Sequence, residues 1–317
     1  MPLVNYIPET FRIPFMRGRH WSFPLSAALT LLSVFGFLVF RLDVGIDFKG
    51  GTLVELQSRA ERADVAAVRE QANALGLGEV EVQEFGNDGR EVSVRVELQP
   101  GGDQGQQPVV EKLRSTLGAD YEFRRVEVVG PRVSGELVQS GTLGVVLSLV
   151  AILVYLWFRF EWQFAIGAVI ATLHDIVLTI GFFALTQLDF NMTSIAAILT
   201  IIGYSLNDTV VVYDRIRETM RKYKRLPIEE LLDRAMNETL ARTLVTGVST
   251  GLALVALAVF GGEVLKSFSY AMLFGLVVGT YSSVFIASPI LIYLGLKLGS
   301  EAPAAADVKV AQPQAAE

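Results

Sequence analysis

Long hydrophobic runs separated by short polar stretches make up most of this chain. A run of about 20 apolar residues is long enough to cross the hydrocarbon core of a bilayer as a helix. Six segments reach that length: 22–41, 137–158, 163–186, 191–213, 241–260 and 268–296. The last is long enough to tilt or to include an interfacial end. The pattern therefore predicts a polytopic α-helical membrane protein with six transmembrane helices.

Residues 42–136, between the first two runs, follow a different pattern. Four stretches alternate apolar and polar residues with period two, as half-buried strands do, and two others carry helical periodicity. The strands are "TLVELQ", "EVEVQEF", "EVSVRVEL" and "YEFRRVEVVG", and the helices "RADVAAVREQANALG" and "PVVEKLRSTLG". "GNDG" between the middle strands is a hairpin signal, and 99–108 is a loop by composition. The order βαββαβ predicts one ferredoxin-like α+β domain.

Composition agrees with a membrane protein: 51% of residues are hydrophobic and the mean hydropathy is +0.44. There is no cysteine, so neither disulfides nor thiolate metal sites can form. The net charge of −6 gives no sign of nucleic-acid binding, because the charges are segregated by loop. "KGG" (49–51) lacks the helix and the Lys-Ser/Thr context of a nucleotide site. The domain at 42–136 has no histidine and no pairing of a nucleophile with a base. From these observations we expect no enzyme activity, no cofactor and no metal.

The distribution of Lys and Arg predicts the orientation in the membrane. Three arginines precede the first span and seven basic residues lie in 214–240, whereas the turn "TQLDF" after the third span has none. We therefore expect both termini and the charged loop 214–240 on the cytoplasmic side, and 42–136 outside. The first run is too long for a cleaved signal peptide, so 1–21 is predicted to be a cytoplasmic segment. Residues 299–317 are low in complexity and predicted to be a disordered cytoplasmic tail.

The fourth run contains an aspartate, Asp208, in "GYSLNDTVVVYDRIRE". A carboxylate at the centre of a membrane helix costs about 2.5–3.5 kcal/mol on insertion scales, so it needs compensation or a function. Arg242, near the start of the fifth run, is predicted to lie at similar depth on an antiparallel neighbour. Mutual pairing of Asp208 and Arg242 is one interpretation. The other is that Arg242 only extends its charge to the interface.

Further polar residues lie in the fifth run. Arg242, Thr246, Ser249 and Thr250 follow one another at helical spacing, which places them on one face. Gly247 and Gly251 form a small-xxx-small pattern that allows close helix approach. The hydroxyls can serve packing or line a hydrated proton path, to which Asn207 beside Asp208 could also contribute.

The third run carries His174 and Asp175 in "ATLHDIVLTIG". Ionisable residues buried in membranes usually face the bundle interior and mark ion pathways. Because neighbouring helical residues point about 100° apart, these two are not expected to form one metal site. Proton handling and structural pairing both remain open for them.

Three motifs together resemble the SecD/SecF family of protein-export membrane proteins, within the resistance–nodulation–division superfamily. They are "GIDFKGGTLVEL" after the first span, "GYSLNDTVVVYDRIRE" at the end of the fourth and "LARTLVTGVST" opening the fifth. The similarity covers about residues 20–298 and is greatest to the SecF type.

This resemblance implies a subunit that pairs with SecD and uses proton-motive force to assist a SecYEG-type translocon in moving unfolded preprotein across the bacterial cytoplasmic (inner) membrane. It implies a proton relay at Asp208, Arg242 and Thr246, completed by an aspartate from SecD, with the proton as coupling ion. Two alternatives are a passive scaffold that stabilises the translocon and one half of a proton-driven exporter of small molecules or lipids.

Overall fold

A computed structural model describes residues 13–86, 88–101, 105–262 and 265–296. Within this part of the chain, six helical stretches are long and apolar enough to cross a membrane: Phe15–Phe40, Pro131–Arg159, Trp162–Thr186, Met192–Lys222, Ile228–Phe260 and Lys266–Tyr293. The six predicted spans are confirmed. The predicted tail, 299–317, lies outside the described residues.

The helices of the bundle follow the predicted runs but extend beyond several of them. They are η1 (Phe15–Gly18), α1 (Arg19–Phe40), α5 (Pro131–Arg159), α6 (Trp162–Thr186), α7 (Met192–Lys222), α8 (Ile228–Phe260), α9 (Lys266–Ser282), the π-helical segment η4 (Ser283–Ala287) and α10 (Ser288–Tyr293). The charged loop 214–240 therefore consists of the end of α7, a turn, and the first turns of α8. Pro227 is the N-cap residue of α8, where its missing N–H costs no helical hydrogen bond.

The sheet domain consists of β1 (Gly51–Ser58), α3 (Val65–Ala74), β2 (Val80–Phe85), β3 (Glu91–Val96), α4 (Gln107–Leu117) and β4 (Tyr121–Val129). All neighbouring strands are antiparallel, in the order β2-β3-β1-β4. The predicted ferredoxin-like arrangement is confirmed. Because side chains alternate between faces, Val54, Leu56 and Val94 are buried on one face against Val68 and Leu113 of the two helices.

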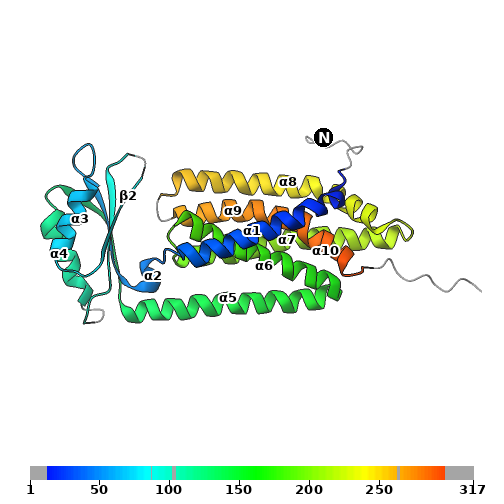
Figure 1. Cartoon of the computed structure of the whole chain (residues 1–317), viewed down its shortest axis with the longest axis horizontal. Helices are drawn as coiled ribbons and strands as arrows, with labels where there is room; N and C mark the ends of the chain where they lie inside the picture. The colour runs from blue at the N-terminus through cyan, green and yellow to red at the C-terminus, as the bar shows by residue number, and fades with distance from the viewer. Residues whose placement is uncertain (1–12, 87, 102–104, 263–264, 297–317) are drawn as a thin grey trace, which may run out of the picture.

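The sheet domain lies at one end of the helical bundle, with α3 and α4 on the side of the sheet away from it (Figure 1). The opposite face of the sheet is directed toward the bundle. Two segments connect the parts: residues 41–50, which contain the short helix α2 (Ile46–Lys49), and β4, which leads directly into α5 at Pro131. The predicted domain limit at residue 136 falls inside α5.

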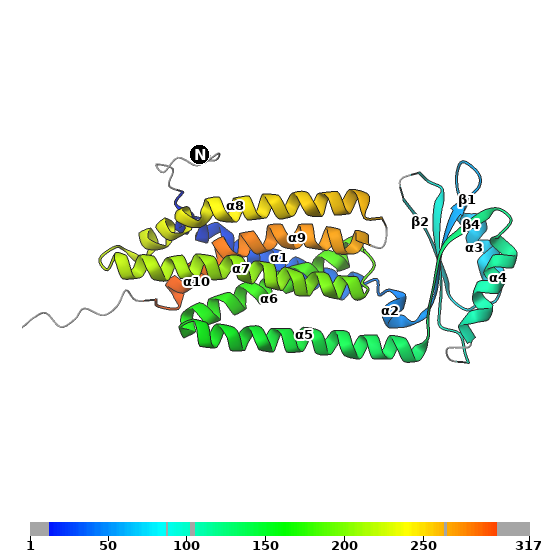
Figure 2. The same cartoon turned by 180° about the vertical axis from the view of Figure 1, so that it is seen from behind.

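Within the bundle, α6, α7 and α9 are the more buried helices, and α5 and α8 lie along its outside (Figures 1 and 2). Only 11% of the most apolar stretch of α5, and likewise of α8, is buried, against 61% for Lys266–Tyr293. The carboxylates at membrane depth lie on the central helices α6 and α7.

Close helix approach in the bundle gives a first testable prediction. A Cβ added to Gly181 of α6 would lie 2.6 Å from the Cα of Ser33 on α1, whereas one added to Gly203 of α7 meets nothing within 4 Å. Gly181→Ala should therefore destabilise the fold by about 1–3 kcal/mol. Gly203→Ala should be neutral or stabilising by up to about 1 kcal/mol, because alanine is the better helix former. Thermal unfolding in detergent, followed by tryptophan fluorescence, would measure both, and equal midpoints would contradict the close packing.

Candidate functional site

Asp208 lies on α7, half-buried against α8 and η4. The Oγ1 of Thr243 on α8 donates a hydrogen bond of 2.7 Å to its Oδ1. The hydroxyl of Ser283, the first residue of η4, is close enough to interact with the same carboxylate. Asp208 Oδ2 is buried and has no hydrogen-bond partner within the described residues. The carboxylate is therefore held at one oxygen, and the other is available to carry a proton.

The predicted direct pairing of Asp208 with Arg242 is not present. No ion pair joins these two side chains in the described structure, and Arg242 acts on Asp208 only as a more distant charge. The reason is the rotation of α8: consecutive helical residues point about 100° apart, and Thr243, not Arg242, faces α7. Arg242 is exposed on the outside of the bundle. It lines a hollow of about 460 Å³ together with Glu238 and residues of α7.

The residues of the predicted polar face of α8 do not all point the same way, because of this rotation. Thr246 and Ser249 are exposed with Arg242, whereas Thr250 is hydrogen-bonded to Tyr204 of α7. Thr243, Gly247 and Thr250 recur at helical spacing and mark the side that contacts α7. The same spacing can be read from the sequence, but the series Arg242, Thr246, Ser249 and Thr250 also has helical spacing and indicated a different face. Asn207 is exposed on α7 and does not join the buried cluster.

Asp175 on α6 forms a second carboxylate site. Its side chain is fully buried, and its Oδ2 accepts hydrogen bonds from the Oγ of Ser205 at 2.6 Å and of Ser282 at 2.7 Å. His174 Nδ1 lies 3.1 Å from Oδ1, while His174 Nε2 is buried without a partner among the described residues. Asp175 therefore joins α6, α7 and α9. The sequence indicated His174 and Asp175 but not the two serines, which are common in membrane helices.

Hydroxyl side chains lie between the two carboxylate sites. Ser282 and Ser283 are adjacent where α9 becomes π-helical, and each contacts a different carboxylate. The Ser283 hydroxyl also shares a 2.9 Å hydrogen bond with Thr209, which follows Asp208 on α7. Single π-helical turns are frequent at functional sites because they displace side chains from the regular α-helical positions. No group of three or more His, Asp or Glu that could hold a metal ion occurs in the described part of the chain.

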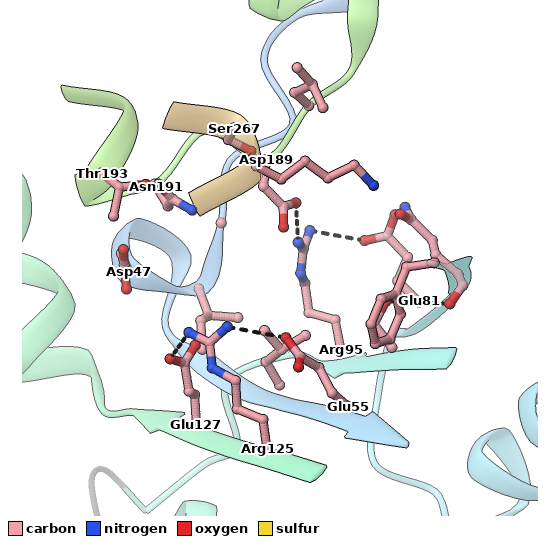
Figure 3. Close-up of a pocket in the computed structure, with 18 of the residues that line it drawn as sticks. Asp47, Glu55, Glu81, Arg95, Arg125, Glu127, Asp189, Asn191, Thr193 and Ser267 are labelled. Atoms are coloured by element: carbon pink, nitrogen blue, oxygen red, sulfur yellow. Dashed lines mark hydrogen bonds and ion pairs between the residues drawn. The ribbon is translucent and has the colours of Figure 1, made fainter. Parts of the chain in front are cut away.

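A further cluster of charges lies where the sheet domain meets the bundle. Arg95 of β3 points out of the sheet toward the bundle (Figure 3), and its side chain is only 14% exposed. Its NH2 nitrogen donates to Asp189, in the loop before α7, at 2.6 Å. Its NH1 nitrogen donates to Asp43 at 3.1 Å and to Glu81 at 3.3 Å. Arg95, Glu81 and Asp189 border a polar cavity of about 440 Å³.

The pKa of the Asp43 carboxyl is shifted in this cluster. Burial raises the pKa of Asp43 above its ordinary value; the Arg95 charge opposes this, and Asp189 and Glu81 add to it. Since the folded protein binds this proton more tightly than the unfolded chain, its contribution to stability is present at low pH. That contribution is lost as the pH rises through the raised pKa.

Asp43→Asn should therefore remove the contribution of this carboxylate to the pH dependence of the protein's stability. Relative to this variant, the unsubstituted chain should gain stability as the pH is lowered from about 7 to about 4, where carboxylates titrate. Thermal midpoints in detergent across that range would measure the difference, with the exposed Asp120→Asn as control. A difference that stays constant with pH would show that Asp43 is not perturbed.

Comparison with known proteins agrees with the architecture. The family model described as "Protein export membrane protein SecD/SecF, C-terminal" matches residues 109–297. Protein translocase subunit SecF of Rickettsia bellii (strain OSU 85-389) is 42% identical over 292 residues, covering 91% of this chain and 95% of the relative. Protein translocase subunit SecDF of Brucella abortus biovar 1 (strain 9-941) is 44% identical over 310 residues. That match covers 98% of this chain but only 41% of the relative.

Solved structures show the same fold. The crystal structure of SecDF from Thermus thermophilus, described as a translocon-associated membrane protein, superposes with a TM-score of 0.81 at 31% identity. It covers 90% of this chain, which corresponds to 39% of that longer chain. A crystal structure of SecDF in a super-membrane-facing form matches with a TM-score of 0.67 at 32% identity. From its family match, its near full-length SecF relatives and its fold, the chain belongs to the SecD/SecF family of protein-export membrane proteins.

Proposed function

We propose that this chain is a SecF-type subunit that pairs with a SecD-type partner and uses proton-motive force to assist preprotein translocation across a bacterial cytoplasmic membrane. The observation that carries this proposal is Asp208, a carboxylate at membrane depth with one hydrogen-bonded oxygen and one oxygen buried without a partner. A carboxylate there is costly, so its presence favours a role in ion transfer over one in packing.

Exposed polar residues at membrane depth support the need for a partner. Arg242, Thr246 and Ser249 of α8 and Asn207 of α7 lie on outer faces of the bundle. Polar and charged side chains are expensive against lipid and normally face a bundle interior or a water-filled cavity. A second helical subunit packed over α8 would enclose them. The SecDF of Brucella abortus is more than twice as long as this chain, and the remainder of such a chain is the natural candidate for the partner half.

Proton binding at Asp208 would change the contacts that hold α7. A proton crossing 100 mV releases about 2.3 kcal/mol, enough to bias two packings of similar free energy. Once protonated, Oδ2 becomes a hydrogen-bond donor, and the attraction to Arg242 disappears. Ser283 and Thr209 would then repack around η4. Asp175, His174 and the serines between the two sites would extend this path; the alternative is that they only hold α6, α7 and α9 together.

The remaining partners follow from this proposal. The sheet domain would lie outside the cytoplasm and contact unfolded preprotein without enzymatic chemistry, while the bundle contacts a SecYEG-type translocon. No cofactor and no nucleic acid take part; the coupling ion is the proton.

Reconstitution tests the proposal. Vesicles that contain this chain and its SecD-type partner should conduct protons under an imposed membrane potential, and vesicles with either subunit alone should not. Absence of flux with both subunits, together with normal export assistance, would favour the passive scaffold.

The proposed orientation is testable because the chain has no cysteine. Gln107→Cys lies at the exposed start of α4 in the sheet domain, and Lys224→Cys lies in the turn between α7 and α8. An impermeant thiol reagent should label the first variant in intact cells and the second only after the membrane is opened. The reverse pattern would invert the topology.

A further inference from the structure

The end of α7 that lies nearest the sheet domain is bound to the segment that leads into that domain. Backbone hydrogen bonds join Gly45 N to Phe190 O at 2.9 Å and Phe190 N to Asp43 O at 2.7 Å. The Asp47 carboxylate of α2 accepts a hydrogen bond of 2.9 Å from the backbone N–H of Met192, the first residue of α7. The N-terminal N–H groups of a helix otherwise lack partners, and a carboxylate there is favoured by the helix dipole.

The sheet itself contributes the Arg95 cluster to the same place. Arg95 binds Asp189, three residues before α7, and Asp43, two residues before Gly45. Figure 3 shows the Arg95 guanidinium between Asp189 and Glu81. A second cluster, Arg125 with Glu55 and Glu127, lies beside it on the same face of the sheet. The Arg95 side chain is 14% exposed and that of Asp189 43%, so this ion pair is only partly open to solvent and salt.

Helix α7 is continuous from this point to Asp208. The two positions are 16 residues apart, which corresponds to about 24 Å along the axis of an α-helix. Asn191 and Ser194 form a capping box that fixes the first turn of α7. This turn contacts residues 43–47, which we call the linker. One continuous helix therefore joins Asp208 to the residues that contact the linker.

Helix α1, by contrast, is interrupted before the same linker. It ends at Phe40, and Arg41 has a φ of 59°, a left-handed value that non-glycine residues rarely adopt. After this break, Val44 pairs with Phe190 in an isolated parallel β-bridge. The linker is thus bonded to the loop residue Phe190 and, through Asp47, to Met192 at the start of α7.

We propose that these contacts, between residues 43–47 and Arg95 on one side and residues 189–192 on the other, form a junction that transmits displacement of α7 to the sheet domain. This inference rests on the proposed function and deepens it. The junction links the proton-binding carboxylate to the domain that would contact preprotein, and Arg95, Asp189 and Asp47 are its positioning residues.

Distance measurement tests the junction. Spin labels on Glu111→Cys of α4 and Thr186→Cys of α6 would report the separation of sheet domain and bundle, since both positions are exposed and native cysteines are absent. The full chain is reconstituted with its partner, with Asp208 either intact or replaced by asparagine as a mimic of the protonated form. We expect the distance distribution to shift between these two forms. Adding Arg95→Gln should abolish the shift and broaden the distribution.

Two further variants keep the result interpretable. Arg124→Gln on β4 removes an exposed ion pair with Glu122 that takes no part in the Arg95 cluster, and should leave the shift intact. Asp189→Asn keeps the shape of the side chain and should reproduce the effect of Arg95→Gln even if the latter assembles poorly. The junction would be overturned if both Arg95→Gln and Asp189→Asn kept the distance distribution and its shift on Asp208→Asn unchanged. It would also be overturned if Asp208→Asn caused no shift in a chain with the junction intact. Proton flux in the same vesicles tests the proposed function separately.

Discussion

Replacing Asp208 with asparagine should abolish proton flux and proton-dependent export assistance while leaving the chain inserted and assembled. Asparagine preserves the size of the side chain and an oxygen that can accept the hydrogen bond from Thr243. It removes the titratable charge and, with it, a burial cost of about 2.5–3.5 kcal/mol at a helix centre. The loss of function should therefore occur without loss of stability.

The matched control lies on the same helix. Asp214 pairs with Arg159 at 2.7 Å, and its side chain is 43% exposed. Asp214→Asn removes the same charge and should cost about 0–1 kcal/mol, as surface ion pairs do, without affecting flux. Flux in vesicles and export in cells would measure both variants, with partner co-purification as the test of assembly. Normal flux in Asp208→Asn would exclude this residue as the proton carrier.

The sequence predicted the architecture because hydrophobic periodicity is sufficient for it. Six long apolar runs and four alternating stretches specify elements whose type depends on local pattern, and the structure has a helix or a strand at each of them. The limits of α7 and α8 were less accurate, because both helices continue through the charged segment beyond the apolar core. Hydropathy locates a membrane crossing, but it does not locate the end of a helix.

The site residues were predicted less completely because helix rotation is not encoded in hydropathy. A membrane helix that is apolar on most of its surface can face its neighbours in several ways. Of the two interpretations open for Arg242, the one in which it faces Asp208 is not met, because Thr243 does so. Ser205, Ser282 and Ser283 are ordinary hydroxyls in the sequence, and only the packing of three helices brings them to the carboxylates. Likewise, Arg95 and Asp189 are 94 residues apart, and nothing local relates them.

The same rotation sharpens the prediction for Arg242. Since Arg242 makes no ion pair with Asp208 and is exposed, Arg242→Met should not disturb the packing of α7 against α8, which depends on Thr243 and on Thr250 with Tyr204. It should nevertheless abolish proton flux, because it removes the positive charge nearby that the proposed relay at Asp208 needs. Arg242→Lys, which keeps the charge but not the planar guanidinium, should retain part of the flux.

Combining the substitutions separates a relay from a structural pair. If Asp208 and Arg242 only balanced each other's charge, removing both charges would restore what each single change damages, as a double-mutant cycle would show. A relay needs both groups, so the double variant Asp208→Asn, Arg242→Met should assemble with the partner, unfold at a temperature no lower than the unsubstituted chain, and remain without flux. Recovery of export in that double variant would reject the relay and favour a scaffold, because a chain without the carboxylate has no group at this depth of α7 to carry the proton.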